Sequence, residues 1–244
     1  MIAIVAAMRE ELAAILAAAT AEGPTRTEIV AGRQLHHATL AGREVVLALS
    51  GVGKVAAAAT AAVLAERVDA MIMVGTAGGL GAEVNPGDVV VATELLQHDL
   101  DVRPLWDRWV SPSTGLARVR TDAALTEALR AAAEVVCAEH RPDLAALGLA
   151  APDVHRGLII SGDVFVATAE GCRTLQAELP DALAVEMEGA ALAQVCYTSE
   201  IPFAVARTIS DRADHEAALD FPKFLAQVAA PYAHDLVIAA LQQL

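Results

Sequence analysis

Short apolar runs alternate with helical patterns along this chain, and the alternation constrains the fold more than any other feature. The apolar runs are too short for helices and predict strands at 2–7, 34–40, 44–50, 70–74, 88–96, 155–161 and 203–209. Helical spacing predicts helices from residue 9 onward and at 54–67, 122–139, 170–179, 189–199 and 221–244. This order predicts an α/β fold, a three-layer sandwich in which helices cover both faces of a mixed, mostly parallel sheet.

The chain length allows either one large α/β domain or two small ones, at 244 residues. Hydrophobic residues make up 55% of the sequence, which is enough apolar surface for one core. No polar linker divides the chain. We therefore expect a single domain over residues 1–244.

The charge balance disfavours nucleic acid as a partner. The net charge is −14, and the 17 Lys and Arg residues are spread along the chain rather than gathered in the basic patch that phosphate backbones require. Neutral or cationic small molecules are the ligands that this charge favours.

The cysteines and the first residues predict a cytoplasmic protein with no membrane partner. Cys137, Cys172 and Cys196 are odd in number and widely separated, which predicts neither a disulfide framework nor a zinc site. Residues 1–8 lack a cationic start and meet charged residues too early for a signal peptide. No apolar run is long enough to cross a bilayer.

Three acidic residues follow predicted strands. Glu11 follows 2–7, Asp211 follows 203–209, and Glu188 follows a further apolar strand that includes Ala184 and Val185. Open α/β sheets bind ligands at the carboxyl ends of their strands, so we expect the three to meet at one edge. A simpler explanation exists for Glu188, because acids in a first helical turn are stabilised by the helix dipole. In an extended segment, Glu186 and Glu188 would share one face and Met187 would lie on the other.

Such acids suit the cleavage of a glycosidic bond. One carboxylic acid protonates the leaving group while a second carboxylate activates water on the opposite face of the sugar. No serine triad competes with this interpretation, because Ser210 has no base near it in sequence and the histidines are scattered. No metal or organic cofactor is implied.

Two glycine-rich segments follow predicted strands. Gly51-Val52-Gly53-Lys54 looks like a phosphate loop, but Ala48 and Val55 stand where that motif needs a glycine and a Ser or Thr. A tight turn between strand and helix is its expected role. Gly75-Thr76-Ala77-Gly78-Gly79 is expected to be a loop whose bare backbone approaches a ligand.

Two segments with aromatic residues leave alternatives open. Phe165 follows the strand 155–161 and indicates either ordinary core packing or stacking on a flat ligand. The segment 102–120 carries both tryptophans and is expected to be a long exposed connection, acting as a lid or as an oligomer contact.

Short motifs stand where the predicted strands begin or end, and jointly they are specific. They are Ala7-Met8-Arg9-Glu10-Glu11, Ser50-Gly51-Val52-Gly53-Lys54-Val55, Gly75-Thr76-Ala77-Gly78-Gly79, Ser161-Gly162-Asp163, Val185-Glu186-Met187-Glu188 and Ile209-Ser210-Asp211. Over nearly the whole chain they resemble the 5′-methylthioadenosine/S-adenosylhomocysteine nucleosidases of the nucleoside phosphorylase superfamily. The resemblance implies that fold and the hydrolysis of both nucleosides to adenine and the 5′-thio-ribose, in methionine salvage. It also implies a homodimer.

The resemblance implies the catalytic roles. Asp211, held by Ser210, would protonate or hydrogen-bond adenine N7, and Glu11 would activate the attacking water. Glu188 would accept hydrogen bonds from the ribose hydroxyls, and the Met187 thioether would lie against the sugar.

The resemblance also implies the remaining substrate contacts. Phe165 would stack on adenine, with the Val166 backbone at the adenine edge. Met8 and Phe221 would surround the 5′-alkylthio group. Arg207 and Thr76 would belong to the ribose and water network, and Glu186 would lie in the substrate site without a defined task. Thr76 departs from the family, which usually has serine there, and its extra methyl group lies near the expected water. The loop from Val102 is also unusual, and Trp106 is the candidate for an aromatic that relatives insert into the neighbouring subunit's pocket.

Three alternatives stay open. A phosphorolytic nucleoside phosphorylase needs arginines for phosphate, whereas Met73 stands at the arginine position and Glu11 would repel the anion. A futalosine-type hydrolase would cleave the same bond beside a larger 5′ group, and pocket length decides between the two. A non-catalytic nucleoside-binding relative is disfavoured because both Glu11 and Asp211 are present.

Overall fold

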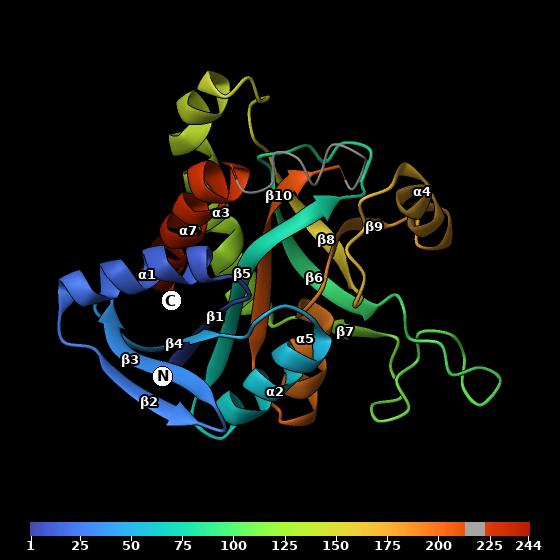
Figure 1. Cartoon of the computed structure of the whole chain (residues 1–244), viewed down its shortest axis with the longest axis horizontal. Coiled ribbons are helices and arrows are strands. Elements are labelled where there is room, and N and C mark those ends of the chain that lie inside the picture. Colours follow the sequence, from blue (N-terminus) through green and yellow to red (C-terminus); the bar gives the residue numbers. More distant parts are fainter. Residues whose placement is uncertain (213–222) are drawn as a thin grey trace.

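A mixed β-sheet forms the centre of the computed structural model, which describes residues 1–212 and 223–244 (Figure 1). The strands are β1 (Ile2–Ala6), β2 (Arg26–Val30), β3 (Arg33–Leu40), β4 (Arg43–Leu49), β5 (Ala70–Gly79), β6 (Val89–Gln97), β7 (Arg118–Arg120), β8 (Val154–Ser161), β9 (Ala182–Glu186) and β10 (Phe203–Asp211). Their order is β10-β6-β8-β9-β5-β1-β4-β3-β2, with β7 beside β6. The predicted α/β fold is thereby confirmed.

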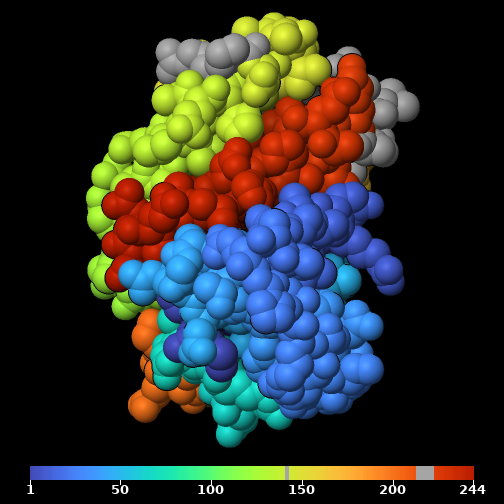
Figure 2. Space-filling view, turned by 90° about the vertical axis from the view of Figure 1, so that its left-hand side faces the viewer, coloured from blue at the N-terminus to red at the C-terminus, as the bar shows by residue number. Residues whose placement is uncertain are grey.

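Helices cover both faces of this sheet. They are α1 (Arg9–Glu22), α2 (Lys54–Ala65), α3 (Ala123–Ala146), α4 (Ala169–Glu178), α5 (Gly189–Thr198) and α7 (Ala230–Gln243), with the π-helical turn η1 (Leu225–Ala229) before α7. Helices α1, α3 and α7 form one layer, and Figure 2 shows α7 in red between α1 and α3. Helices α2 and α5 pack together on the opposite face (Figure 1).

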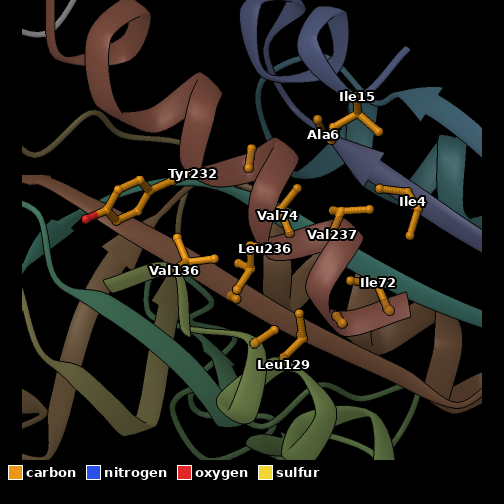
Figure 3. Close-up of a cluster of buried hydrophobic side chains, with 14 of the residues drawn as sticks. Ile4, Ala6, Ile15, Ile72, Val74, Leu129, Val136, Tyr232, Leu236 and Val237 are labelled. Atoms are coloured by element: carbon orange, nitrogen blue, oxygen red, sulfur yellow. The ribbon is translucent and has the colours of Figure 1, made fainter. Parts of the chain in front are cut away.

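The alternation of side chains along the strands builds a separate core on each face. In β1, Ile4 and Ala6 face the α1, α3 and α7 layer, while Ala3 and Val5 face α2 and α5. Figure 3 shows the first core, where Ile4 lies near Ile15 of α1 and Val237 of α7. Strands buried on both faces explain why the sequence shows continuous apolar runs rather than alternation.

Strand β5 differs from the prediction. The segment 75–79 was expected to be a loop, but it continues β5 to Gly79. Along this segment β5 pairs with β10 on one side, and Gly78 and Gly79 pair with β9 on the other. The sheet curls so that β5, β10, β6, β8 and β9 pair in a closed ring. Hydrogen bonds to distant strands therefore override the low strand propensity of glycine.

Strands β1, β4, β5 and β10 run parallel, so their carboxyl ends meet at one edge of the sheet. Helix α1 follows β1 at this edge. Helix α5 follows β9, which runs antiparallel to β5. The helix predicted at 122–139 extends to Ala146, and β2, which the apolar pattern did not indicate, pairs with β3 as an edge strand. Within residues 1–212 and 223–244, no helix is long and apolar enough to cross a membrane.

Candidate active site

A cavity of about 200 Å³ lies at the carboxyl edge of the parallel strands. Every predicted site residue that the structure describes lines it: Met8, Glu11, Thr76, Phe165, Val166, Glu186, Met187, Glu188, Arg207, Ser210 and Asp211. Phe221, the remaining predicted contact, lies outside the described residues. The position agrees with the rule that α/β sheets bind ligands beyond the carboxyl ends of their strands.

Glu11 is the most buried acid of this cavity, at 1% exposure. It lies in the first turn of α1, where its Oε2 accepts a hydrogen bond of 3.1 Å from the backbone N–H of Met8. Its Oε1 makes no hydrogen bond within the described part of the chain. Burial raises the pKa of Glu11, against the opposing effects of Arg207 and of nearby backbone N–H groups. A carboxylate with a raised pKa and an open lone pair suits the activation of water.

Arg207 lies at the centre of the acids, fully buried in β10. Its guanidinium pairs with Glu186 and lies 3.3 Å from the Glu188 carboxylate. Gly75 is its neighbour across the β5–β10 pair, and a Cβ there would overlap the guanidinium and lie 3.3 Å from Glu11. Glycine at this position is therefore what allows Arg207 and Glu11 to approach each other.

Glu188 stands where β9 gives way to α5, and it is the N-cap residue of that helix. Its Oε1 accepts a hydrogen bond of 2.8 Å from the Gly53 backbone N–H. Burial raises the pKa of Glu188 to about 7, with Glu186 adding to the rise and Arg207 opposing it. The tight turn at Gly51–Lys54 thus has a second task, because it positions this carboxylate.

The prediction that Glu186 and Glu188 share one face of an extended segment is only partly met. β9 ends at Glu186 and the chain turns at Glu188, so the two residues do not belong to one extended segment. Their carboxylates nevertheless converge, because Arg207 binds both. Glu186 also accepts hydrogen bonds from the N–H groups of Glu188 and Gly189, so the helix-start explanation applies to Glu186.

Asp211 lies at the end of β10, where the strand is irregular. The β10–β5 register shifts between Ile209 and Asp211, which is a bulge that changes the direction of the side chains. Ser210 Oγ lies 2.6 Å from Asp211 Oδ2, a donor to the carboxylate, and 3.3 Å from the Ala77 carbonyl. Both residues line the cavity and are partly exposed, whereas Glu11 is buried.

Phe165 belongs to the rim of the cavity rather than to a core. Its side chain is 52% exposed, in the loop after β8, so ordinary core packing is wrong for this residue. Lys54 and Asp163 tie this loop to the glycine turn, because the Lys54 N–H donates to Asp163 at 2.7 Å. The Lys54 ammonium pairs with Asp99 at 2.6 Å, and Asp99 also accepts from the Asp163 N–H.

The sequence reasoning did not identify Val52 and Val164 as cavity residues, although both line it and both are 59% exposed. Val52 lies in the turn that was interpreted only as a packing feature. The available signal was their position soon after a strand, with Val52 between Gly51 and Gly53 and Val164 next to Phe165. Within the described ranges, no group of three or more His, Cys, Asp and Glu side chains could hold a metal ion.

Comparisons with known proteins agree on one family. Residues 1–242 match the family model described as the phosphorylase superfamily. The chain is 38% identical to the 5′-methylthioadenosine/S-adenosylhomocysteine nucleosidase of Anoxybacillus flavithermus over 246 residues, covering 100% of this chain and 98% of the relative.

Solved structures of the same kind superpose over the full length. The nucleosidase from Neisseria meningitidis, in complex with methylthio-immucillin-A, is 35% identical with a TM-score of 0.86, covering 100% of this chain and 99% of that one. The nucleosidase from Colwellia psychrerythraea, in complex with adenine, is 33% identical with a TM-score of 0.87, covering 100% and 95%.

Proposed function

Because the chain belongs to the phosphorylase superfamily, and within it to the 5′-methylthioadenosine/S-adenosylhomocysteine nucleosidases, we propose that it hydrolyses the N-glycosidic bond of both nucleosides. The products are adenine and the 5′-thio-ribose. One observation carries this proposal: a single cavity collects Glu11, Glu188 and Asp211 from three separate strand ends, with Phe165 at its rim. The whole chain acts as one nucleosidase domain.

We propose that Glu11 and Asp211 divide the acid and base work. Glu11 is deeply buried and has an open lone pair, which supports its role as the group that activates water. Asp211, oriented by the Ser210 hydroxyl, donates to adenine N7 so that the base leaves as a neutral purine. Two carboxyl groups in unlike environments are what an inverting glycosidic cleavage requires.

The sugar and the base occupy the space between these acids. Glu188 accepts from the ribose hydroxyls, Met187 lies against the ring, and Arg207 keeps Glu188 oriented through their contact of 3.3 Å. Phe165 stacks on adenine with the Val166 backbone at its edge. Met8 lines the site of the 5′-alkylthio group, and Thr76 completes the water network beside Glu11.

The charge of the cavity opposes the phosphorolytic alternative. Arg207 is the sole Lys or Arg among the cavity-lining residues that the structure describes, and two glutamates already pair with it. Met73 contacts the same guanidinium through its sulfur, at 3.5 Å. A phosphate anion would therefore meet carboxylates rather than unpaired arginines.

The test is adenine release from each nucleoside in phosphate-free buffer. We expect turnover that added phosphate does not increase. A protein that requires phosphate, or that ignores both nucleosides while cleaving futalosine, would contradict the proposal.

We also propose a cytoplasmic homodimer that acts in methionine salvage. The loop after β6 exposes Leu105 by 85% and Trp106 by 46%, and such apolar exposure supports a subunit contact at this loop. Light scattering is expected to give a dimer that Trp106→Glu converts to a monomer. A wild-type protein that stays monomeric at every concentration refutes this part.

A further inference from the structure

The Glu186 carboxylate is occupied by donors from the protein itself. Its side chain is 2% exposed, at the end of β9. The Ser161 hydroxyl and the Arg207 guanidinium each donate to one of its oxygens. The Glu188 N–H donates at 3.0 Å, and the Gly189 N–H lies 3.0 and 2.8 Å from the two oxygens. With this many donors, the carboxylate has little capacity left for a ligand.

Two of these donors, Arg207 and the Glu188 N–H, belong to residues that line the cavity. Arg207 Nη2 is shared between Glu186 and Glu188, so the position of the guanidinium decides what Glu188 contacts. The N–H groups of Glu188 and Gly189 begin α5. Gly189 leaves room for this arrangement, since a Cβ there would lie 3.3 Å from Glu186 Oε1 and 2.6 Å from Leu95.

We infer that Glu186 is a positioning residue, which holds Arg207 and the start of α5 so that the Glu188 carboxylate faces the ribose. It does not bind the substrate itself, and this replaces the substrate contact expected from the sequence. The inference rests on the proposed function, because it concerns the ribose contact assigned to Glu188.

The charges around Glu188 make this role measurable. Glu186 faces Glu188 from β9, Arg207 from β10, Glu11 from α1, and the Gly53 N–H from the turn before α2. Of these, Glu186 and Glu11 raise the pKa of Glu188, while Arg207 and Gly53 lower it. Glu186→Gln removes a neighbouring negative charge and also leaves Arg207 to Glu188 alone. Both changes lower the pKa of Glu188.

The first experiment compares pH profiles of kcat/KM for the wild type, Glu186→Gln and Glu44→Gln. Glu44 is exposed at the start of β4, so its variant controls for the loss of one negative charge. We expect a loss of about 100-fold for Glu186→Gln, the scale of a misplaced positioning group. The acidic limb of its pH profile, where Glu188 titrates, should move about one pH unit lower. The Glu44→Gln profile should match the wild type.

Ser161→Ala covers the case in which Glu186→Gln does not fold. It removes one donor to Glu186 and the acceptor of the Ala190 N–H, and it leaves all the charges in place. We expect a loss of about tenfold with the acidic limb of the pH profile unmoved, because Glu186 loses one hydrogen bond while every charge stays in place. Wild-type rates for Ser161→Ala overturn the inference.

The second experiment separates sugar from base. In an Asp211→Asn background, calorimetry gives the affinities for 5′-methylthioadenosine and for adenine. Adding Glu186→Gln should weaken nucleoside binding at least tenfold and leave adenine binding unchanged. An unmoved acidic limb, or an equal loss for both ligands, overturns the inference. Failure of the wild type to bind or cleave the nucleoside would instead reject the proposed function.

Discussion

Replacing Gly75 by alanine is expected to displace the buried guanidinium of Arg207. The new Cβ would overlap that group and would lie 3.3 Å from Glu11 Oε1. The guanidinium is the far end of a flexible side chain, so it would rotate away from the new Cβ rather than force the backbone to shift. By moving, the guanidinium would lose its contacts with Glu186, Glu188 and the Val74 carbonyl, which lies 3.4 Å from Nη1.

The cost follows from what Arg207 holds together. Its side chain and that of Glu186 are 1% and 2% exposed, so breaking their pair leaves buried charges uncompensated. Such losses amount to about 3–5 kcal/mol. We therefore expect the free energy of unfolding to fall by about 3 kcal/mol, and Tm by roughly 10 °C for a chain of this size. Turnover should fall about 100-fold, because Glu188 loses its cationic partner.

Urea titration and adenine release, at one fixed protein concentration, measure both effects. Gly23→Ala is the matched control, because Gly23 has an extended backbone and nothing lies within 4 Å of the point that a Cβ would occupy there. Its stability should stay within about 0.5 kcal/mol of the wild type. If Gly75→Ala also stays within that range and keeps its turnover, the steric argument is wrong.

Three further predictions concern single side chains. Asp211→Asn should lower kcat at least about 100-fold while the substrate Kd changes little, because the side chain keeps its shape but loses the proton donor. Unchanged single-turnover rates would show that another residue is the acid. Phe165→Ala should weaken adenine binding by about 1–3 kcal/mol, the value of a base–aromatic stack, whereas Ile29→Ala, at a side chain 70% exposed in β2, should not. If calorimetry gives the same adenine affinity for both variants, stacking is refuted. The pKa of Glu188 is raised from 4.5 to about 7, so between these values the folded protein holds a proton that the unfolded chain releases. Binding of this proton stabilises the folded state, and the stabilisation is lost as pH rises through 7. Glu188→Gln should therefore gain stability relative to the wild type between pH 5 and pH 8 in urea titrations, and a constant difference would contradict the shift.

The sequence predicted most of the secondary structure correctly because its signals are local. Strands buried on both faces, such as β1, leave continuous apolar runs, and helices leave a repeat of three to four residues. The segment 75–79 was misjudged because glycine has low strand propensity, whereas its pairing partners lie in β9 and β10, more than a hundred residues away in sequence.

The site shows the same division. Glu11 and Asp211 could be placed at one edge from the sequence, because β1 and β10 both run parallel to β5 and share its carboxyl edge. Glu188 reaches the same cavity from β9, which runs antiparallel to β5. Motif resemblance supplied the substrate and the individual roles. Neither source indicated that Val52 lines the cavity or that the Gly53 N–H binds Glu188, since both depend on how the β4–α2 turn meets α5.

By itself, the sequence determined the α/β architecture, because strand and helix patterns depend on local composition and spacing. Its motifs, by their resemblance to a known family, indicated the family and most of the residues that line the cavity. Only the tertiary structure decided what those residues do to one another. Curling of the sheet brings Glu186 and Glu188 against Arg207, and burial there raises the pKa of Glu188. Charge coupling depends on distance and desolvation, and neither quantity exists before the chain has folded.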